Sequence, residues 1–197
     1  MTERTATIER STRETAITVS VRLDRAGGSA IGTGLGFLDH MLTALATHAR
    51  MGLDVRCTGD LDVDDHHTVE DCAIAIGQAL DAALGDRRGV ARFGSAYAPL
   101  DESLARAVVD LSGRAHATVH LGLRRDRLGA VACENITHFF ASVAASARLT
   151  LHLDVLRGEN DHHKAEAAFK AFALALRAAV ARVPGIDDVP STKGTLA

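Results

Sequence analysis

Tryptophan is absent from this chain of 197 residues, and aromatic side chains make up only 4% of it. So few aromatic rings argue against a base-stacking surface for single-stranded nucleic acid. The formal net charge of −3 gives no electrostatic attraction to nucleic acid or to an anionic membrane. We therefore expect neither of these partners.

Cysteine is also scarce: Cys57, Cys72 and Cys133 are scattered, with no CxxC motif. An odd, dispersed set argues against a disulfide framework and indicates a reducing cytoplasm. No apolar run approaches the roughly 18 residues of a membrane-spanning helix. The polar residues 1–4 do not resemble a signal peptide. We therefore expect a cytoplasmic protein.

What the chain does contain is a repeated arrangement of histidine and glutamate. The two stretches read Asp65-His66-His67-Thr68-Val69-Glu70 and Asp161-His162-His163-Lys164-Ala165-Glu166. Imidazole and carboxylate ligands together suit Mn, Fe, Ni or Zn. The same ligand set twice in one small chain predicts a dinuclear metal site.

The repeat extends beyond these two stretches. Three further pairs occupy matching places: His40 and His138, Arg50 and Arg148, and Glu14 and Glu102. A period close to half of the chain indicates a duplicated half-domain rather than a solenoid. We expect one unit over residues 1–91 and a second over residues 92–197, the latter including the C-terminal tail.

Apolar periodicity predicts the fold class. Ile17, Val19 and Val21 alternate with polar residues, as in a strand with one buried face. We expect strands over residues 17–23, 53–57, 92–98, 104–111, 115–121 and 151–155, and helices over residues 37–49, 66–84, 138–148 and 165–182. The result is an α+β fold in which each half is a small, mostly antiparallel sheet with two helices on one face.

Helical geometry explains the ligand spacing. Successive residues on a helix are rotated by roughly 100°, so adjacent histidines reach two different ions. A glutamate three and four residues further along shares a face with both. We expect each ion to take ligands from both halves. A helix amino terminus also disfavours charged imidazole, which predicts the neutral, ligating form. The alternative is that adjacent histidines are ordinary surface residues, with the glutamate complementing the helix dipole.

Other polar residues are more ambiguous. His48 lies eight residues after His40 on the same predicted helix. Its side chain either faces the pocket that His40 faces or lies outside that pocket. Residues 190–194 (Pro-Ser-Thr-Lys-Gly) either hold a phosphate or form a disordered tail. Three basic residues are candidate partners of such a phosphate: Arg92, Arg114 and Lys170. Three histidines are expected on strands, without a catalytic role: His116, His120 and His152.

Taken in order, the motifs of this chain closely resemble those of the imidazoleglycerol-phosphate dehydratases. They are Phe37-Leu38-Asp39-His40-Met41, the stretch from Asp65 to Asp71, Arg92-Phe93-Gly94, Asp110-Leu111-Ser112-Gly113-Arg114, His138-Phe139-Phe140, the stretch from Asn160 to Glu166, and Pro190-Ser191-Thr192-Lys193-Gly194. The resemblance implies two manganese ions. Their implied ligands are His40, His66, His67, Glu70, His138, His162, His163 and Glu166. By pseudo-symmetry we group His40, His67 and Glu70 at one ion, and His138, His163 and Glu166 at the other, with His66 and His162 crossing over between the two groups.

The resemblance also implies a reaction and an assembly. D-erythro-imidazoleglycerol phosphate would lose water to give imidazole acetol phosphate, a step of histidine biosynthesis. Glu14 would act as acid and base beside the substrate, more readily than Asp101 or Glu102. Six of the metal ligands would also take part in catalysis: His66, His67, Glu70, His162, His163 and Glu166. The substrate would contact Glu14, His40, His48, His66, His67, Glu70, His162 and His163, and its phosphate would be held by Arg92, Arg114, Lys170, Ser191 and Lys193. A homo-oligomer of 24 chains, built from trimers, would share sites between chains.

Two other functions remain open from the residues alone. A dinuclear hydrolase acting on a phosphoester would also pair two ions with basic residues. A metal-storing or structural assembly would instead require saturated coordination. The residues do not fix the metal, because His/Glu sets also accept Fe, Co or Zn.

Overall fold

The computed structural model describes residues 3–196. The first half contains β1 (Thr5–Ser11), β2 (Thr15–Arg22), β3 (Ile31–Gly32), α1 (Gly36–Ala49), β4 (Gly52–Gly59) and α2 (His66–Leu84). The second half contains β5 (Phe93–Leu100), β6 (Ser103–Asp110), β7 (His116–His120), β8 (Arg127–Leu128), β9 (Val131–Ala132), α3 (Cys133–Ser146), β10 (Thr150–Arg157) and α4 (Asp161–Val180).

The two halves build sheets of the same topology. The strand orders are β1-β2-β4-β3 and β5-β6-β10-β7. In each sheet the first three strands are antiparallel, and the last strand pairs in parallel. The second half adds the small β8–β9 hairpin before α3. The predicted α+β fold of two similar, mostly antiparallel halves is confirmed.

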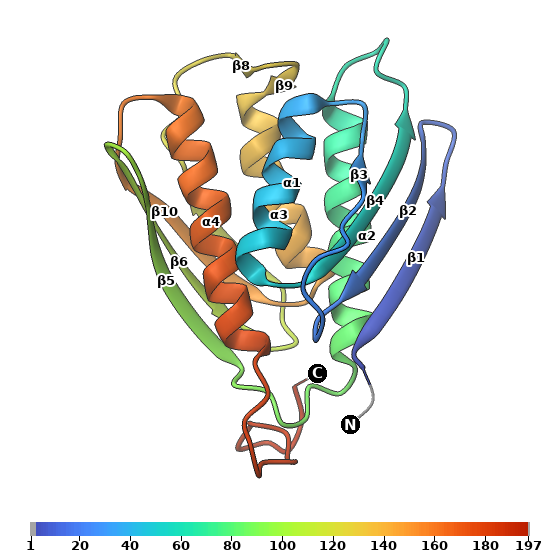
Figure 1. Ribbon diagram of the computed structural model, residues 1–197, viewed down its shortest axis with the longest axis vertical. Coiled ribbons are helices and arrows are strands. Elements are labelled where there is room, and N and C mark those ends of the chain that lie inside the picture. The colour runs from blue at the N-terminus through green and yellow to red at the C-terminus, as the bar shows by residue number, and fades with distance from the viewer. Residues whose placement is uncertain (1–2, 197) are drawn as a thin grey trace.

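The four helices lie side by side between the two sheets, with their amino-terminal ends at the top of Figure 1. Helix α4 packs on β5 and β6, and α2 packs on β1 and β2. Across the two halves, α1 packs against α4 and α2 against α3. These cross-half contacts bring the histidines of one half next to the helices of the other.

The core follows from the alternation that the sequence displays. On β2, Ile17, Val19 and Val21 are buried, while the residues between them are more exposed. Phe140 and Phe169 meet in the helical layer with ring centroids 4.6 Å apart. Burial of such side chains contributes about 1.5–3 kcal/mol each, so this layer stabilises the packing of the helices.

One glycine sets a close approach between a sheet and a helix. A Cβ atom on Gly94 of β5 would lie 2.0 Å from the carbonyl oxygen of Ala175 on α4. Any side chain there would therefore push α4 away from β5. The glycine of the Arg92-Phe93-Gly94 motif thus has a structural role.

The repeated arginines mark helix ends. Arg50, the C-cap of α1, has a φ of 53°, and Arg148, which follows α3, has a φ of 51°. Both occupy the left-handed region that commonly terminates helices. An arginine in this conformation at the corresponding helix end of each half is therefore a result of the duplication.

Several predicted bounds were wrong. Strand β1 was not predicted, because only Ala6 and Ile8 give it an apolar face. Helix α3 begins at Cys133 rather than at residue 138, and α4 at Asp161 rather than at residue 165. The chain passes between the halves from Leu84 to Phe93, and the domain boundary at residues 91 and 92 stays a prediction. Within residues 3–196, no helix combines the length and the apolarity needed to cross a bilayer.

Candidate metal centre

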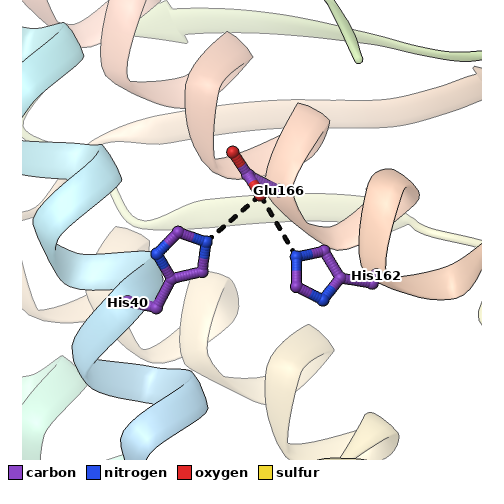
Figure 2. A group of neighbouring side chains, drawn as sticks. All are labelled: His40, His162 and Glu166. Atoms are coloured by element: carbon purple, nitrogen blue, oxygen red, sulfur yellow. Dashed lines mark hydrogen bonds and ion pairs between the residues drawn. The ribbon is translucent and has the colours of Figure 1, made fainter. Parts of the chain in front are cut away.

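Two clusters of histidine and glutamate lie among the helices. In the first, which we call the Glu166 group, His40 of α1 meets His162 and Glu166 of α4. Both Nε2 atoms lie 3.2 Å from Oε2 of Glu166, and Figure 2 shows the two rings directed at this one carboxylate. One atom from each residue, all within 4.8 Å of one another, could ligate a single ion.

The second cluster is the equivalent set from the other pair of helices. In this Glu70 group, His66 and Glu70 of α2 meet His138 of α3. Nε2 of His138 lies 2.9 Å from Oε1 of Glu70, and Nε2 of His66 lies 3.5 Å from Oε2. Two imidazoles and one carboxylate are a donor set that divalent transition metals accept, with positions left for further ligands.

Each group combines residues from both halves of the chain, as expected of the metal sites, and their role as ligands stays a prediction. The expected crossing over of His162 to the His40 group and of His66 to the His138 group agrees with these clusters. Within the chain the glutamates differ from the expected grouping, because Glu166 lies with His40 and Glu70 lies with His138. The reason is that α1 packs against α4, and α2 against α3. On each helix the first histidine of the pair, four residues before the glutamate, is the one that joins it.

The second histidine of each pair points elsewhere. Nδ1 of His67 donates to Asp60 at 3.0 Å, and Nε2 lies 3.7 Å from Glu14. Nδ1 of His163 donates to Glu102 at 2.7 Å. In both residues Nδ1 is engaged, which leaves Nε2 as the atom available to a ligand outside these clusters.

The carboxylates beside these second histidines shift their pKa in the direction opposite to that expected of a helix amino terminus. The hydrogen bond to Asp60 raises the pKa of His67, and the hydrogen bond to Glu102 raises the pKa of His163. A helix amino terminus was expected to favour the neutral ring. The adjacent carboxylates outweigh that effect, because a nearby negative charge stabilises the imidazolium.

Glu14 and Glu102 occupy matching turns but have different surroundings. Glu102 accepts from His163 and from the backbone amides of Glu159 and Asn160, and these bonds hold its pKa well below the ordinary range. The Glu14 side chain is 51% exposed, and within residues 3–196 its carboxylate approaches only His67, at 3.7 Å. In the first half Asp60 accepts the hydrogen bond from Nδ1 of the second histidine, as Glu102 does in the second half. The Glu14 carboxylate is therefore left with the longer 3.7 Å approach to Nε2 of His67.

A buried network supports the Glu70 group. Asp65 is only 3% exposed and accepts from the amide of Ala132, from Nδ2 of Asn135 and from Arg127. Oδ1 of Asn135 in turn lies 2.9 Å from Nδ1 of His66. The sequence analysis did not identify Asn135 as a site residue, because no motif or residue spacing in the sequence connects it with His66. The acidic residue that precedes each histidine pair was a signal for Asp65.

The Glu166 group carries a neighbouring cation. Nζ of Lys170, one helical turn further along α4, lies 2.7 Å from Oε1 of Glu166. Burial disfavours the Glu166 carboxylate, but hydrogen bonds from Lys170 and His40 outweigh it and lower its pKa to about 2. Of the basic residues expected to hold a phosphate, Lys170 is therefore the one that lies beside a metal group.

The remaining phosphate candidates lie at the other end of the helices. Arg92 bonds to Asp110 and to the carbonyl of Pro190, which ties the tail bearing Ser191 and Lys193 to β6. The amide of Arg92 also donates to the carbonyl of Ala179 near the end of α4. Glu166 and Ala179 are about 20 Å apart along the helix, at about 1.5 Å rise per residue. Within one chain these basic residues and the metal groups are therefore not brought together.

The other candidates lie outside both groups. His48 is half-buried in the last turn of α1, two turns beyond His40. Arg114 is exposed after β6. His116 and His120 lie on β7 and His152 on β10, all exposed, as expected for strand histidines.

The duplicated fold and the paired groups define a class of protein with a candidate dinuclear His/Glu centre. The family profile described as imidazoleglycerol-phosphate dehydratase matches residues 33–176. Relatives of that name are 55% identical over 194 residues in Salinibacter ruber, covering 98% of this chain and 96% of that protein, and 51% identical over 221 residues in Saccharomyces cerevisiae, covering all of both. A Phytophthora nicotianae relative is 58% identical over 194 residues, covering 98% of this chain but only 43% of that protein.

Solved structures agree with these matches. The imidazoleglycerol-phosphate dehydratase of Staphylococcus aureus aligns with a TM-score of 0.83 and 39% identity over 91% of this chain and 99% of that one. The enzyme from Pyrococcus furiosus aligns with a TM-score of 0.83 and 36% identity over 96% and 100%. The chain belongs to the imidazoleglycerol-phosphate dehydratase family. It is an enzyme, a hydro-lyase of histidine biosynthesis.

Proposed function

We propose that this chain catalyses the manganese-dependent dehydration of D-erythro-imidazoleglycerol phosphate to imidazole acetol phosphate, in the cytoplasm. The observation that carries the proposal is the pair of equivalent His/Glu groups in a chain of this family. A substrate with an imidazole ring offers two nitrogen donors, one for each ion.

The donor sets fit divalent metal ions. Each group combines two imidazole nitrogens with one carboxylate, and a single carboxylate serves both rings. The ligands would be His66, Glu70 and His138 at one ion, and His40, His162 and Glu166 at the other. Ions bound there would hold the imidazole ring of the substrate and lower its pKa, as a metal lowers that of bound water from about 15.7 to about 7.

His67 and His163 would complete these sites from a neighbouring chain. Their Nδ1 atoms are held by Asp60 and Glu102, and their Nε2 atoms lie outside the chain's own groups. A histidine whose Nδ1 donates to a carboxylate presents Nε2 as a metal ligand in a fixed orientation. All eight ligands predicted from the sequence would then be used.

Glu14 is the proposed acid and base. Loss of water breaks the C–O bond beside the ring and a C–H bond on the next carbon, and the resulting enol becomes a ketone. A carboxylate can take up that proton only if it is not already engaged. Glu14 is half-exposed with one contact among the described residues, to His67, whereas Glu102 is held by four hydrogen bonds, from Ser103, Glu159, Asn160 and His163.

The substrate phosphate would be held by Lys170 and by Arg92, Arg114, Ser191 and Lys193. The separation of about 20 Å between Glu166 and the Arg92 end of α4 exceeds the length of one substrate molecule. Metal groups and tail residues that act on the same substrate must therefore come from different chains. This separation supports the homo-oligomer, which we propose to be a 24-mer built from trimers.

The test is direct. The purified protein, supplied with Mn²⁺ and imidazoleglycerol phosphate, should form a ketone while the phosphate stays attached. Release of inorganic phosphate without a ketone would instead identify a dinuclear hydrolase. Binding of Mn²⁺ with neither product would favour a metal-storing or structural protein.

A further inference from the structure

We propose that Asn135 is a positioning residue that makes the two metal groups unequal, so that the Glu70 group binds a divalent cation more tightly than the Glu166 group. This inference rests on the proposed function, which assigns metal binding to both groups. Two differences between otherwise equivalent positions carry it: a buried amide beside one group and an ammonium beside the other.

The hydrogen bonds around Asp65 fix the orientation of the Asn135 amide. The backbone amide of Ala132 and the guanidinium of Arg127 can only donate, and both meet Asp65, at 2.7 and 3.1 Å. Asp65 therefore acts as a carboxylate acceptor. Nδ2 of Asn135 donates to the same carboxylate at 2.9 Å, which turns Oδ1 of Asn135 the other way.

That orientation fixes the tautomer of His66. Oδ1 of Asn135 lies 2.9 Å from Nδ1 of His66, and an amide oxygen can only accept. Nδ1 of His66 therefore carries the proton. In the neutral ring, Nε2 then presents its lone pair to the Glu70 group, as metal ligation requires.

Burial makes this relay rigid. Asp65 is 3% exposed and Asn135 is 5% exposed, so water does not compete for their hydrogen bonds. A hydrogen bond from Nδ1 raises the basicity of a ligating imidazole and holds its ring plane. His66 is thus prepared for a cation before the cation arrives.

The Glu166 group lacks this relay. Phe37 occupies the place, three residues before His40, that Asn135 occupies before His138. Its ring stands edge-on to His162 with the centroids 5.4 Å apart. In the part of the chain that the structure describes, no side chain bonds to Nδ1 of His162. Asp161, the equivalent of Asp65, accepts instead from the backbone amides of residues 124 and 125 and from Lys164.

The second difference acts in the same direction. Lys170 lies four residues after Glu166 and 2.7 Å from its carboxylate. The equivalent position, four residues after Glu70, is Ile74. An ammonium at that distance competes with a cation for the Glu166 oxygens, and an aliphatic side chain cannot. Both differences therefore favour filling of the Glu70 group first.

The experiment is a Mn²⁺ titration of the metal-stripped full-length protein, with free Mn²⁺ counted by electron paramagnetic resonance. The wild type should show a tight and a weaker class of site. Asn135→Leu, which keeps the volume but cannot accept, should weaken the tight class about 10- to 100-fold. Phe37→Leu at the equivalent position is the matched control and should leave the tight class unchanged.

The variant Glu166→Gln removes the carboxylate of the Glu166 group and should leave only the Glu70 group to bind Mn²⁺. Tight binding that persists in this variant identifies the tight class as the Glu70 group. There Asn135→Leu should still weaken the remaining site. A second variant, Lys170→Met, should tighten the weak class, and it keeps the inference testable if Asn135→Leu does not fold. Equal affinity of both classes in the wild type would overturn the inference, as would unchanged Mn²⁺ binding by both variants.

A purely structural role of Asn135 gives a different result. It would weaken both classes together and lower the melting temperature of the metal-free protein, which would also overturn the inference. A wild type that binds no Mn²⁺ at all would instead refute the metal assignment of the proposed function. The two failures are therefore distinguishable.

Discussion

Nε2 of His138 and Oε1 of Glu70 lie 2.9 Å apart, although they come from α3 and α2 and from different halves of the chain. The pair has its counterpart in His40 and Glu166, which are 3.2 Å apart. Duplication has therefore produced two groups that neither half could form alone. Each group depends on the packing of one half's helices against those of the other.

The first prediction concerns Glu14. Glu14→Gln should retain Mn²⁺ and substrate binding but lower kcat about 10²- to 10⁴-fold, because the amide cannot exchange the proton. Steady-state kinetics and Mn²⁺ titration measure the two effects separately. Glu9→Gln, on an exposed position of β1, is the matched control and should keep wild-type activity. Wild-type turnover in Glu14→Gln would exclude this role.

The second prediction concerns sites shared between chains. Glu70→Gln removes a metal ligand, and Lys193→Ala removes a tail ammonium, so each homo-oligomer should have little activity. Co-expressed chains should recover roughly a quarter of wild-type activity, because random mixing restores sites that take each part from an intact chain. Activity per chain in purified mixed oligomers is the measurement. No recovery would mean that both parts act from one chain.

The third prediction concerns Arg87 in the connection between the halves. This arginine is 1% exposed and donates to the carbonyls of Leu111, Ala147 and Arg148. Arg87→Met would leave these buried acceptors without a donor, at about 1–3 kcal/mol each.

The apparent free energy of unfolding of Arg87→Met should therefore fall by several kcal/mol, as measured by urea denaturation at fixed protein concentration. Arg13→Met, at an exposed site in the β1–β2 turn, should change it by less than about 0.5 kcal/mol. Equal stability of the two variants would show that Arg87 does not join the halves.

The fourth prediction concerns pH. The guanidinium of Arg4 holds the pKa of Asp24 well below its ordinary value, and Arg182 also contacts this carboxylate. Because the folded-state pKa is lowered, the stabilisation is present above the unfolded pKa of about 3.9 and is lost as pH falls through the folded pKa.

Asp24→Asn should thus cost about 1 kcal/mol at pH 7, and progressively less below about pH 4. Urea denaturation of wild type and variant at several pH values gives the difference. A difference that stays constant down to pH 3 would contradict the assigned cause.

Much of the fold was predictable because the repeat and the apolar periodicity can both be read directly from the sequence. Ile17, Val19 and Val21 indicate a strand by alternation alone, and their burial confirms it. Strand β1 was missed because most of its side chains are polar, so its pairing with β2 had to be seen in three dimensions. The start of α3 was missed because its first turn, at Cys133, lacks a side-chain cap.

The candidate site was only partly predictable. Helical spacing placed Glu70 on a face shared with His66 and His67, and Glu166 on a face shared with His162 and His163, but it did not decide which histidine of each pair lies with the glutamate. It could not tell which helix of the other half would pack alongside, so Glu70 was grouped with His40 and Glu166 with His138, whereas within the chain Glu70 lies with His138 and Glu166 with His40. Asn135 was invisible for the same reason, since its partner His66 lies 69 positions away in sequence.

The most direct test of the central claim is anomalous X-ray diffraction from crystals of the protein grown with Mn²⁺. Two manganese peaks per chain should lie at the Glu70 and Glu166 groups, each with a histidine from a neighbouring chain, His67 or His163, in its coordination shell. Absence of manganese from both groups, or its binding only elsewhere on the chain, would contradict the account.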